Sequence, residues 1–264
     1  MRALLLAVVL FCGSAFSKEA DSKSFLDLKK TINYFVRGSY LQFQEKNNLY
    51  YAAAGVPLTW YAFEEDQRMS DLQRSKPLRK SYDIVGDLGI VFNFPLVPLA
   101  FYAYGRNNNN THVQQFAMEY MATMYLTLLE TGIISYIPGH ERPNKEGQSK
   151  WETSFRGKNS FPSGHIVPYA TLFFKTLQFY GPYWSLPPLI LTYWSSLQRA
   201  REGRHYVSDL IGSFFLSAFA SEGVRRAAGY KNNHPFYQWL FEHEVEVGLS
   251  YHDGAYGPRL IYRF

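Results

Sequence analysis

Three short blocks of the sequence combine residue types that bind anions and transfer protons. They are residues 141–143 (Glu-Arg-Pro), residues 161–165 (Phe-Pro-Ser-Gly-His), and residues 199–209, which begin with arginine and contain histidine and aspartate. Arginine offers a fork of N–H donors that suits phosphate oxygens, and histidine exchanges protons near neutral pH. Each block lies at the end of an apolar stretch, so we expect helices to position it.

The second block predicts an anion site at the start of a helix. A helix N-terminus presents free backbone N–H groups and the positive end of the helix dipole. Ser163 can cap the helix or donate to an oxyanion, and Gly164 allows a ligand to approach the backbone closely. We expect His165 in the first helical turn, beside a bound anion.

The third block places a histidine and a carboxylate on one helix face. His205 and Asp209 are four residues apart, the spacing at which helical side chains meet. A carboxylate in that position accepts the Nδ1 proton and leaves Nε2 to act as nucleophile or base. Taken singly, these features also fit a surface His–Asp pair, an ordinary helix cap, or arginines at a membrane edge.

Together the blocks resemble the type 2 phosphatidic acid phosphatase and vanadium haloperoxidase superfamily. Its pattern is K-x6-R-P, then P-S-G-H, then S-R-x5-H-x3-D. Residues 162–165 complete the second element, and Arg199, His205 and Asp209 have the spacing of the third. The resemblance spans about residues 86–222.

The sequence departs from that pattern at two positions. Ser135 stands where the family has lysine, and no lysine lies in the range 81–144; Gln198 stands where the family usually has serine. Loss of one charge-assisted hydrogen bond costs about 1.5–3 kcal/mol, or about tenfold to a hundredfold in binding or rate. The cations that could compensate are Arg201, Arg204 and Lys145.

The resemblance implies a covalent mechanism. His205 would attack phosphorus, Asp209 would orient His205, and His165 would protonate the departing oxygen and then activate water. The residues implied to bind the phosphoryl oxygens are Arg142, Ser163, Gly164 and Arg199. No metal or other cofactor is expected.

The hydropathy pattern predicts a succession of helices around the blocks. A charge-dense connection is expected at 64–84, and Gly181-Pro182 is expected to divide one apolar stretch in two. The expected apolar helices are 86–104, 116–137, about 164–180, about 183–200 and about 205–222. Alternating apolar residues from Val245 onward, around a turn at Asp253-Gly254, predict a β-hairpin.

We therefore expect an all-α fold: a bundle of five to six main helices, mostly membrane-embedded, with a small C-terminal β-hairpin. The expected organisation is a signal peptide (1–17), a polar and amphipathic segment (18–85), a phosphatase-like helical core (86–225) and a C-terminal extension (226–264).

The N-terminus predicts export. Arg2 is followed by an uncharged run to Cys12 and by small residues at Ala15 and Ser17, the order found in a secretory signal peptide. An uncleaved anchor is the alternative. The single cysteine lies in this segment, so disulfides and thiolate metal sites are excluded from the mature chain. We expect a protein of the cell-envelope membrane whose active site faces the periplasm or the outside.

Composition narrows the function classes. Of the 264 residues, 47% are apolar, which excludes a chain that is disordered throughout. The net charge of +5 suits an anionic substrate or membrane surface and is too weak to indicate nucleic acid. With a mean hydropathy of −0.24, the chain fits both soluble and membrane-embedded proteins.

The substrate that the resemblance favours is a lipid phosphate, since apolar helices bracket the blocks. Candidates are phosphatidic acid, phosphatidylglycerol phosphate, undecaprenyl diphosphate and lipid A phosphates. Three alternatives stay open: a soluble secreted acid phosphatase, a vanadium-dependent haloperoxidase, and a phosphate-binding protein without activity. The sequence does not determine the oligomeric state.

Overall fold

The computed structural model describes residues 18–137, 139–144, 159–241, 244–252 and 255–263. The expected signal peptide lies outside this part. The described elements, in chain order, are α2 (Lys18–Leu41), α3 (Asn47–Glu64), α4 (Asp66–Arg74), α5 (Lys80–Phe92), α6 (Leu96–Asn107), α7 (Thr111–Ile134), α9 (Val167–Arg201), α10 (Val207–Ala228), α11 (Pro235–Phe241), β1 (Glu244–His252) and β2 (Ala255–Arg263).

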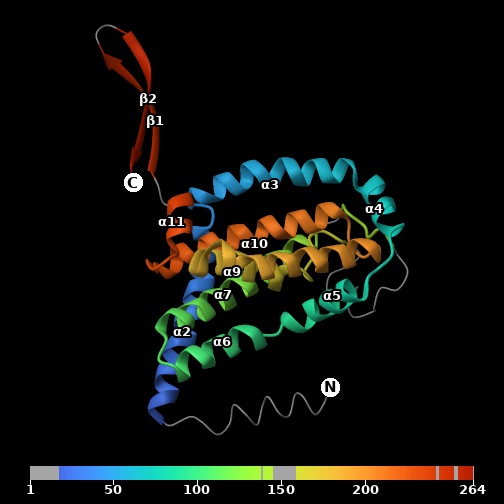
Figure 1. Cartoon of the computed structure of the whole chain (residues 1–264), viewed down its shortest axis with the longest axis horizontal. Helices are drawn as coiled ribbons and strands as arrows, with labels where there is room; N and C mark the ends of the chain where they lie inside the picture. Colours follow the sequence, from blue (N-terminus) through green and yellow to red (C-terminus); the bar gives the residue numbers. More distant parts are fainter. Residues whose placement is uncertain (1–17, 138, 145–158, 242–243, 253–254, 264) are drawn as a thin grey trace.

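The body of the molecule is all-α, as predicted, and α10 is its central helix. It packs against α2, α3, α7 and α9, and Figure 1 shows α9 and α10 between α3 on one side and α5 and α6 on the other. Small residues on α10 make this packing possible. At Gly223, a Cβ atom would lie 2.5 Å from the carbonyl oxygen of Gly38 on α2.

The sequence-predicted break inside α9 is confirmed. Gly181 has φ +79 and ψ −175, so the helical conformation is interrupted there. A Cβ atom at this position would lie 2.5 Å from the His234 ring. Both observations require glycine at this position. The expected long helix near 116–137 corresponds to α7, which starts earlier because the side chain of Asn110 accepts a hydrogen bond from the N–H of Val113 at 3.1 Å.

The prediction of one continuous helix over 86–104 is wrong. The chain forms α5 and α6 instead, bent by 71° at a break that contains Pro95. Proline disfavours helical geometry in the residue before it. Among the described residues, no helix on its own has the length and apolarity needed to cross a bilayer, and this bent pair meets those criteria only when taken together.

The prediction of a solvated connection at 64–84 is also wrong in part. It contains α4, which packs against α9 and α10. Asp66, the first residue of α4, is buried, because its carboxylate accepts hydrogen bonds from the backbone N–H and the hydroxyl of Ser208 on α10. The described part thus holds nine helices, more than the five to six main helices expected.

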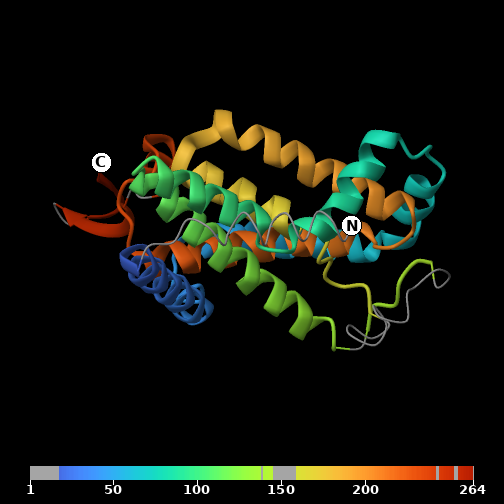
Figure 2. The ribbon, with the colours of Figure 1, turned by 90° about the horizontal axis from the view of Figure 1, so that it is seen from below.

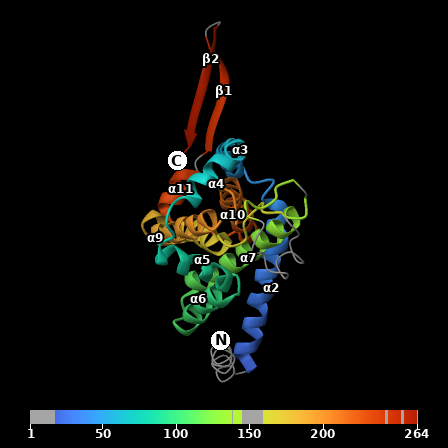
Figure 3. The same cartoon turned by 90° about the vertical axis from the view of Figure 1, so that its right-hand side faces the viewer.

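At the end of the chain, β1 and β2 pair antiparallel, with Glu244 opposite Arg263 and His252 opposite Ala255. The two strands project beyond α11, away from the helical body, in two perpendicular views (Figures 1 and 3).

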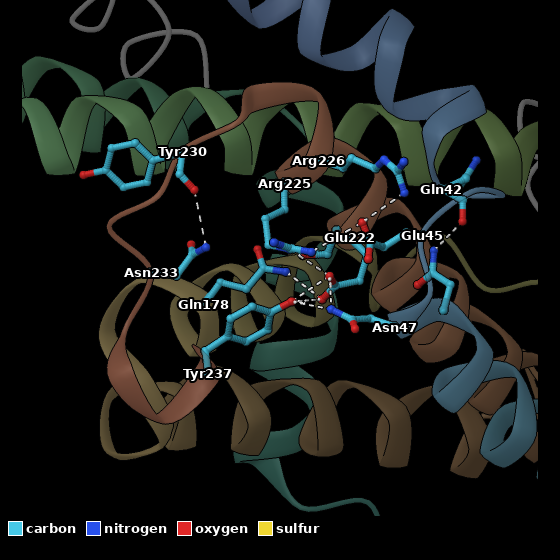
Figure 4. A network of polar contacts seen from close by, with 12 residues as sticks. Gln42, Glu45, Asn47, Gln178, Glu222, Arg225, Arg226, Tyr230, Asn233 and Tyr237 are labelled. Atoms are coloured by element: carbon cyan, nitrogen blue, oxygen red, sulfur yellow. Dashed lines mark hydrogen bonds and ion pairs between the residues drawn. The ribbon is translucent and has the colours of Figure 1, made fainter. Parts of the chain in front are cut away.

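A buried polar network ties the helices together on the side of α11. Glu222 on α10 accepts hydrogen bonds from Gln178 of α9 at 3.0 Å, from Asn47 of α3 at 3.2 Å and from the Tyr237 hydroxyl of α11. Figure 4 shows these side chains converging on Glu222. Arg225 pairs with the same carboxylate at 2.9 Å, so the buried charge is compensated.

A second ion pair lies beside this network. Lys175 of α9 and Glu119 of α7 are fully buried and 3.0 Å apart. The Lys175 ammonium also donates to Gln178 at 2.8 Å and to the Ser221 carbonyl oxygen at 2.9 Å. All three acceptors lie in the interior, which accounts for a charged residue in an otherwise charge-poor stretch.

We predict that Lys175→Met lowers the free energy of unfolding by about 3–5 kcal/mol, because it leaves the Glu119 carboxylate buried without its cation. Urea unfolding monitored by circular dichroism measures the change. Lys30→Met is the matched control: Lys30 pairs with Asp27 at the same 3.0 Å, but its side chain is 56% exposed, so the expected loss is at most about 1 kcal/mol. Equal losses in the two variants would contradict the prediction.

Candidate active site

Backbone hydrogen bonds bring the three sequence blocks together at one end of the bundle. The N–H of Asn144 donates to Gly203 O at 2.9 Å, and the N–H of Ser163 donates to Asp209 O at 3.3 Å. Figure 2 shows segments 139–144 and 159–166 at the end opposite the strands. Gly203 has φ +65, and a Cβ atom there would lie 3.1 Å from Asn144 Cβ. Only glycine suits this junction without strain.

The predicted His–Asp pair is present and buried. His205 Nδ1 lies 3.2 Å from Asp209 Oδ2, and both side chains are fully buried. The N–H of Tyr206 donates to the same oxygen at 2.8 Å, so Asp209 caps the N-terminus of α10. Burial by itself raises the pKa of Asp209, but hydrogen bonds from histidines outweigh it and lower the pKa below its usual value.

His165 lies next to this pair. The ring centroids of His165 and His205 are 6.2 Å apart, with 61° between the ring planes. The expectation that His165 occupies the first helical turn is wrong: Ile166 is the N-cap of α9, so residues 162–165 form a buried loop just before the helix. Ser163 Oγ is buried in this loop, and the described part of the chain offers it no hydrogen-bond partner. It is therefore an available donor for a ligand.

The two candidate arginines are both buried, with 3% of Arg142 and 6% of Arg199 exposed. Arg199 Nη2 lies 3.1 Å from Glu202 and 3.7 Å from Asp87. Its Nε donates to Gln198 Oε1 at 2.6 Å. Thus Gln198, where the family has serine, fixes the Arg199 guanidinium, whose charge is shared with two carboxylates.

The position of the missing family lysine carries no compensating charge. Ser135 lies at the C-terminal end of α7, and its hydroxyl donates to Gly132 O at 2.7 Å. Of the cations suggested as substitutes, Arg201 donates to Pro77 O at 2.7 Å, and Arg204 Nε lies 3.7 Å from Glu202. Lys145 lies outside the described residues.

The structure adds a residue that the sequence did not single out, His140. Its Nδ1 lies 2.8 Å from Asp209 Oδ1, and its Nε2 lies 3.0 Å from Asp66 Oδ2. Burial by itself lowers the pKa of His140, but the hydrogen bonds with Asp209 and Asp66 outweigh burial and raise the pKa to about 9. His140 is therefore a cation between two carboxylates at neutral pH.

Ser160 completes the surroundings of His140. Its backbone N–H donates to His140 O at 2.7 Å, and its hydroxyl is 3.3 Å from Asp209 Oδ1. One feature of the sequence could have pointed to His140: it lies two residues before the candidate Arg142. Nothing in the sequence marks Asp66, because it lies in a charge-dense stretch far from the three blocks.

An apolar cleft of about 620 Å³ borders the site. Its walls come from α3, α7 and α10 and from the loop residues Phe161 and Pro162. Phe161 fits against α10 because residue 212 is glycine: a Cβ atom there would lie 2.4 Å from the Phe161 ring. A second apolar cleft of about 480 Å³ includes Ile166 and Val207 in its lining. The first cleft thus reaches the loop that contains His165, and the second reaches residues within two positions of His165 and His205.

Comparison with known proteins supports the resemblance seen in the sequence. A family model described as the PAP2 superfamily matches residues 116–232, a range that contains all three blocks. No curated protein and no solved structure matches the chain. Within the described part of the chain, no group of three or more histidine, cysteine, aspartate or glutamate side chains is arranged to hold a metal ion.

The raised pKa of His140 predicts a loss of stability at alkaline pH. The folded state holds the proton with a pKa of about 9, against 6.5 when unfolded. The contribution is thus fully present below pH 6.5 and is lost as pH rises through about 9. It is on the order of 3 kcal/mol.

Urea unfolding of the wild type at several pH values from 6 to 9.5 measures this loss. We expect His140→Gln to flatten the dependence. His112→Gln is the control, because burial lowers the pKa of His112, so His112 causes no loss of stability as pH rises. An unchanged slope in His140→Gln would show that other groups cause the loss.

Proposed function

The PAP2 superfamily model matches residues 116–232, and we propose on this premise that the chain is a phosphatase-type hydrolase that cleaves lipid phosphate esters or diphosphates through a phosphohistidine. The observation that carries the proposal is the buried His205–Asp209 pair, with Nδ1 bonded to the carboxylate and a second histidine ring 6.2 Å away. The reaction needs a nucleophile, a carboxylate that orients it and a general acid, and His205, Asp209 and His165 are proposed to supply these three groups.

In the first step, His205 Nε2 donates an electron pair to phosphorus, and the bond between phosphorus and the leaving-group oxygen breaks. His165 gives its proton to that oxygen. The Asp209 carboxylate stabilises the positive charge that develops on the His205 imidazole and keeps Nδ1 protonated. A buried carboxylate suits this role because few water molecules screen its charge.

In the second step, His165 accepts a proton from water as the water oxygen attacks phosphorus. The phosphorus–nitrogen bond breaks, inorganic phosphate leaves and His205 returns to its neutral state. The phosphoryl oxygens are proposed to be bound by Arg142, Arg199, the Ser163 hydroxyl and the Gly164 N–H. Arg199 then exchanges part of its interaction with Glu202 for the phosphate.

The apolar cleft supports a lipid as the substrate. Phe161 and Pro162 line it and directly precede the Ser163–His165 loop, so a hydrocarbon chain in the cleft places its phosphate end at the loop. Two residues at its lining are strongly exposed, Val56 at 66% and Trp60 at 68%. Exposed apolar side chains around an apolar cleft are typical of a surface that meets lipid. We propose a location in the cell envelope, at an extracytoplasmic membrane face.

We predict that His205→Ala lowers phosphate release from a lipid phosphate and from p-nitrophenyl phosphate by about a thousandfold or more, because the nucleophile is lost. His112→Ala is the control, since His112 hydrogen-bonds Tyr230 through Nδ1 at 2.7 Å, away from the three blocks, and should retain activity. Acid quenching of the wild type should trap a phosphorylated enzyme that His205→Ala does not form.

Vanadate should inhibit this reaction, because it resembles the transition state of phosphoryl transfer. Undiminished turnover in His205→Ala would overturn the proposed mechanism. Peroxide-dependent bromination of a phenolic dye, activated by vanadate, would instead favour haloperoxidase activity.

The lipid part of the proposal has its own test at Ala52, which lines the cleft on α3. Ala52→Trp fills part of the cleft, so we expect KM for a long-chain lipid phosphate to rise about tenfold, with p-nitrophenyl phosphate turnover unchanged. Ala53→Trp is the matched control, because Ala53 is exposed and outside the cleft lining. Equal behaviour of the two variants toward the long-chain substrate would contradict a lipid chain in this cleft.

A further inference from the structure

We propose that His140, held in place by Asp66, is a positioning residue that orients the Asp209 carboxylate behind the nucleophile His205. The inference rests on the proposed function, because it concerns the rate at which His205 attacks phosphorus. His140 does not touch the reacting atoms itself; it acts through Asp209.

The hydrogen bonds divide between the two carboxylate oxygens of Asp209. Oδ2 accepts from the Tyr206 N–H at 2.8 Å and lies 3.2 Å from His205 Nδ1. Oδ1 lies 2.8 Å from His140 Nδ1 and 3.3 Å from Ser160 Oγ. A carboxylate held at only one oxygen can rotate about its Cβ–Cγ bond. Contacts at both oxygens fix its plane and therefore the direction in which the His205 ring points.

Asp66 orients His140 in turn. Its Oδ2 lies 3.0 Å from His140 Nε2, and its Oδ1 accepts from the Ser208 N–H at 3.2 Å. Asp66 is thus fixed to the first turn of α10, the same turn that carries Asp209. The chain Asp66–His140–Asp209–His205 therefore begins and ends on residues anchored at one helix N-terminus.

The charges along this chain balance only with a protonated His140. Two carboxylates flank its ring, and both ring nitrogens must carry a proton to donate to them. With His140 as a cation, Asp66, His140 and Asp209 sum to one negative charge. The imidazolium that forms on His205 during attack then brings the group to neutrality. Without the cation, two buried anions would face each other, and Asp209 would tend to take up a proton.

Among the described residues, no cationic side chain contacts His140. Asp66 comes from α4, Asp209 from α10 and Ser160 from the loop before α9. The Tyr206 ring lies 4.6 Å from the His140 ring, and the Phe63 ring of α3 lies 4.7 Å from it. The contacts of the imidazole are thus two carboxylates, a hydroxyl and two aromatic rings.

The test compares His140→Gln with wild type over pH 4–10, using a soluble short-chain lipid phosphate. Gln retains a donor for one partner but carries no charge. We expect kcat to fall about tenfold to a hundredfold, the loss that accompanies one charge-assisted hydrogen bond, with KM changed less than about twofold. The acid limb of the pH profile should move to higher pH, because Asp209 binds a proton more readily once the hydrogen bond from the His140 cation is lost.

Asp66→Asn is the second variant. It keeps an acceptor for Ser208 while removing the charge that stabilises protonated His140, so the same shift of the acid limb is expected at smaller amplitude. Phe63→Leu is the packing control, since it changes a contact of the His140 ring without changing charge. Because Phe63 also lines the apolar cleft, it is compared with His140→Gln on p-nitrophenyl phosphate, which has no hydrocarbon chain to occupy the cleft, and its pH profile should match wild type. Thermal unfolding of each variant establishes the temperature at which all are folded, and the kinetics are measured there.

The outcomes separate the two proposals. If His205→Ala is inactive and His140→Gln keeps the wild-type kcat and pH profile, the positioning role is wrong and the proposed function stands. If His205→Ala is fully active, the proposed function itself fails. A fall in kcat of equal size for His140→Gln and Phe63→Leu, with neither profile shifted, would assign His140 a packing role only.

Discussion

The buried carboxylate of Asp209 is the constraint on which the arrangement of the site depends. A carboxylate without solvent is costly unless hydrogen bonds and opposite charge surround it. Here the partners come from three separate stretches of chain: Tyr206 and His205 just before α10, His140 after α7, and Ser160 before α9. Satisfying one charge therefore requires three loops to meet, and those loops carry three of the phosphate-binding candidates, namely Arg142, Ser163 and Gly164.

The central helix carries a second such constraint toward its other end. Glu222 is 1% exposed and lies 13 residues after Asp209, about 20 Å along a helix. Its partners again come from separate elements, namely α3, α9 and α11. Asp209 and Glu222 are hydrogen-bonded to neighbouring elements near the two ends of α10. The helix can therefore neither slide nor rotate against these neighbours without leaving a buried charge without its partners. The apolar contacts between these points do not specify register so strongly, since small side chains line much of the helix.

The sequence predicted the parts of this arrangement that local chemistry determines. Glycine and proline marked the break in α9 at Gly181, and residue spacing brought His205 and Asp209 together. It did not predict the bend between α5 and α6, because a hydropathy pattern reports length and apolarity but not direction. Nor did it predict Asp66 or His140, which act through contacts between elements distant in sequence. A charge-dense stretch such as 64–84 looks solvated until a partner such as Ser208 is known.

Under the proposed function, the same loop serves both recognition and chemistry. Phe161 packs against Gly212 on α10 and lines the apolar cleft, while Ser163 and His165, two and four residues later, belong to the proposed phosphate site. Under the proposed function, a hydrocarbon chain in the cleft contacts the loop that carries the general acid. Binding energy from the remote chain can then hold the phosphate end in line with His205, which is how remote binding raises kcat rather than only lowering KM. A small phosphate ester lacks that contact and depends on the arginines and the loop donors alone. With Ser135 in place of the family lysine, the site has one cation fewer than the family pattern. The proposed function therefore implies that positioning by the apolar chain carries more of the discrimination between a lipid phosphate and free phosphate esters.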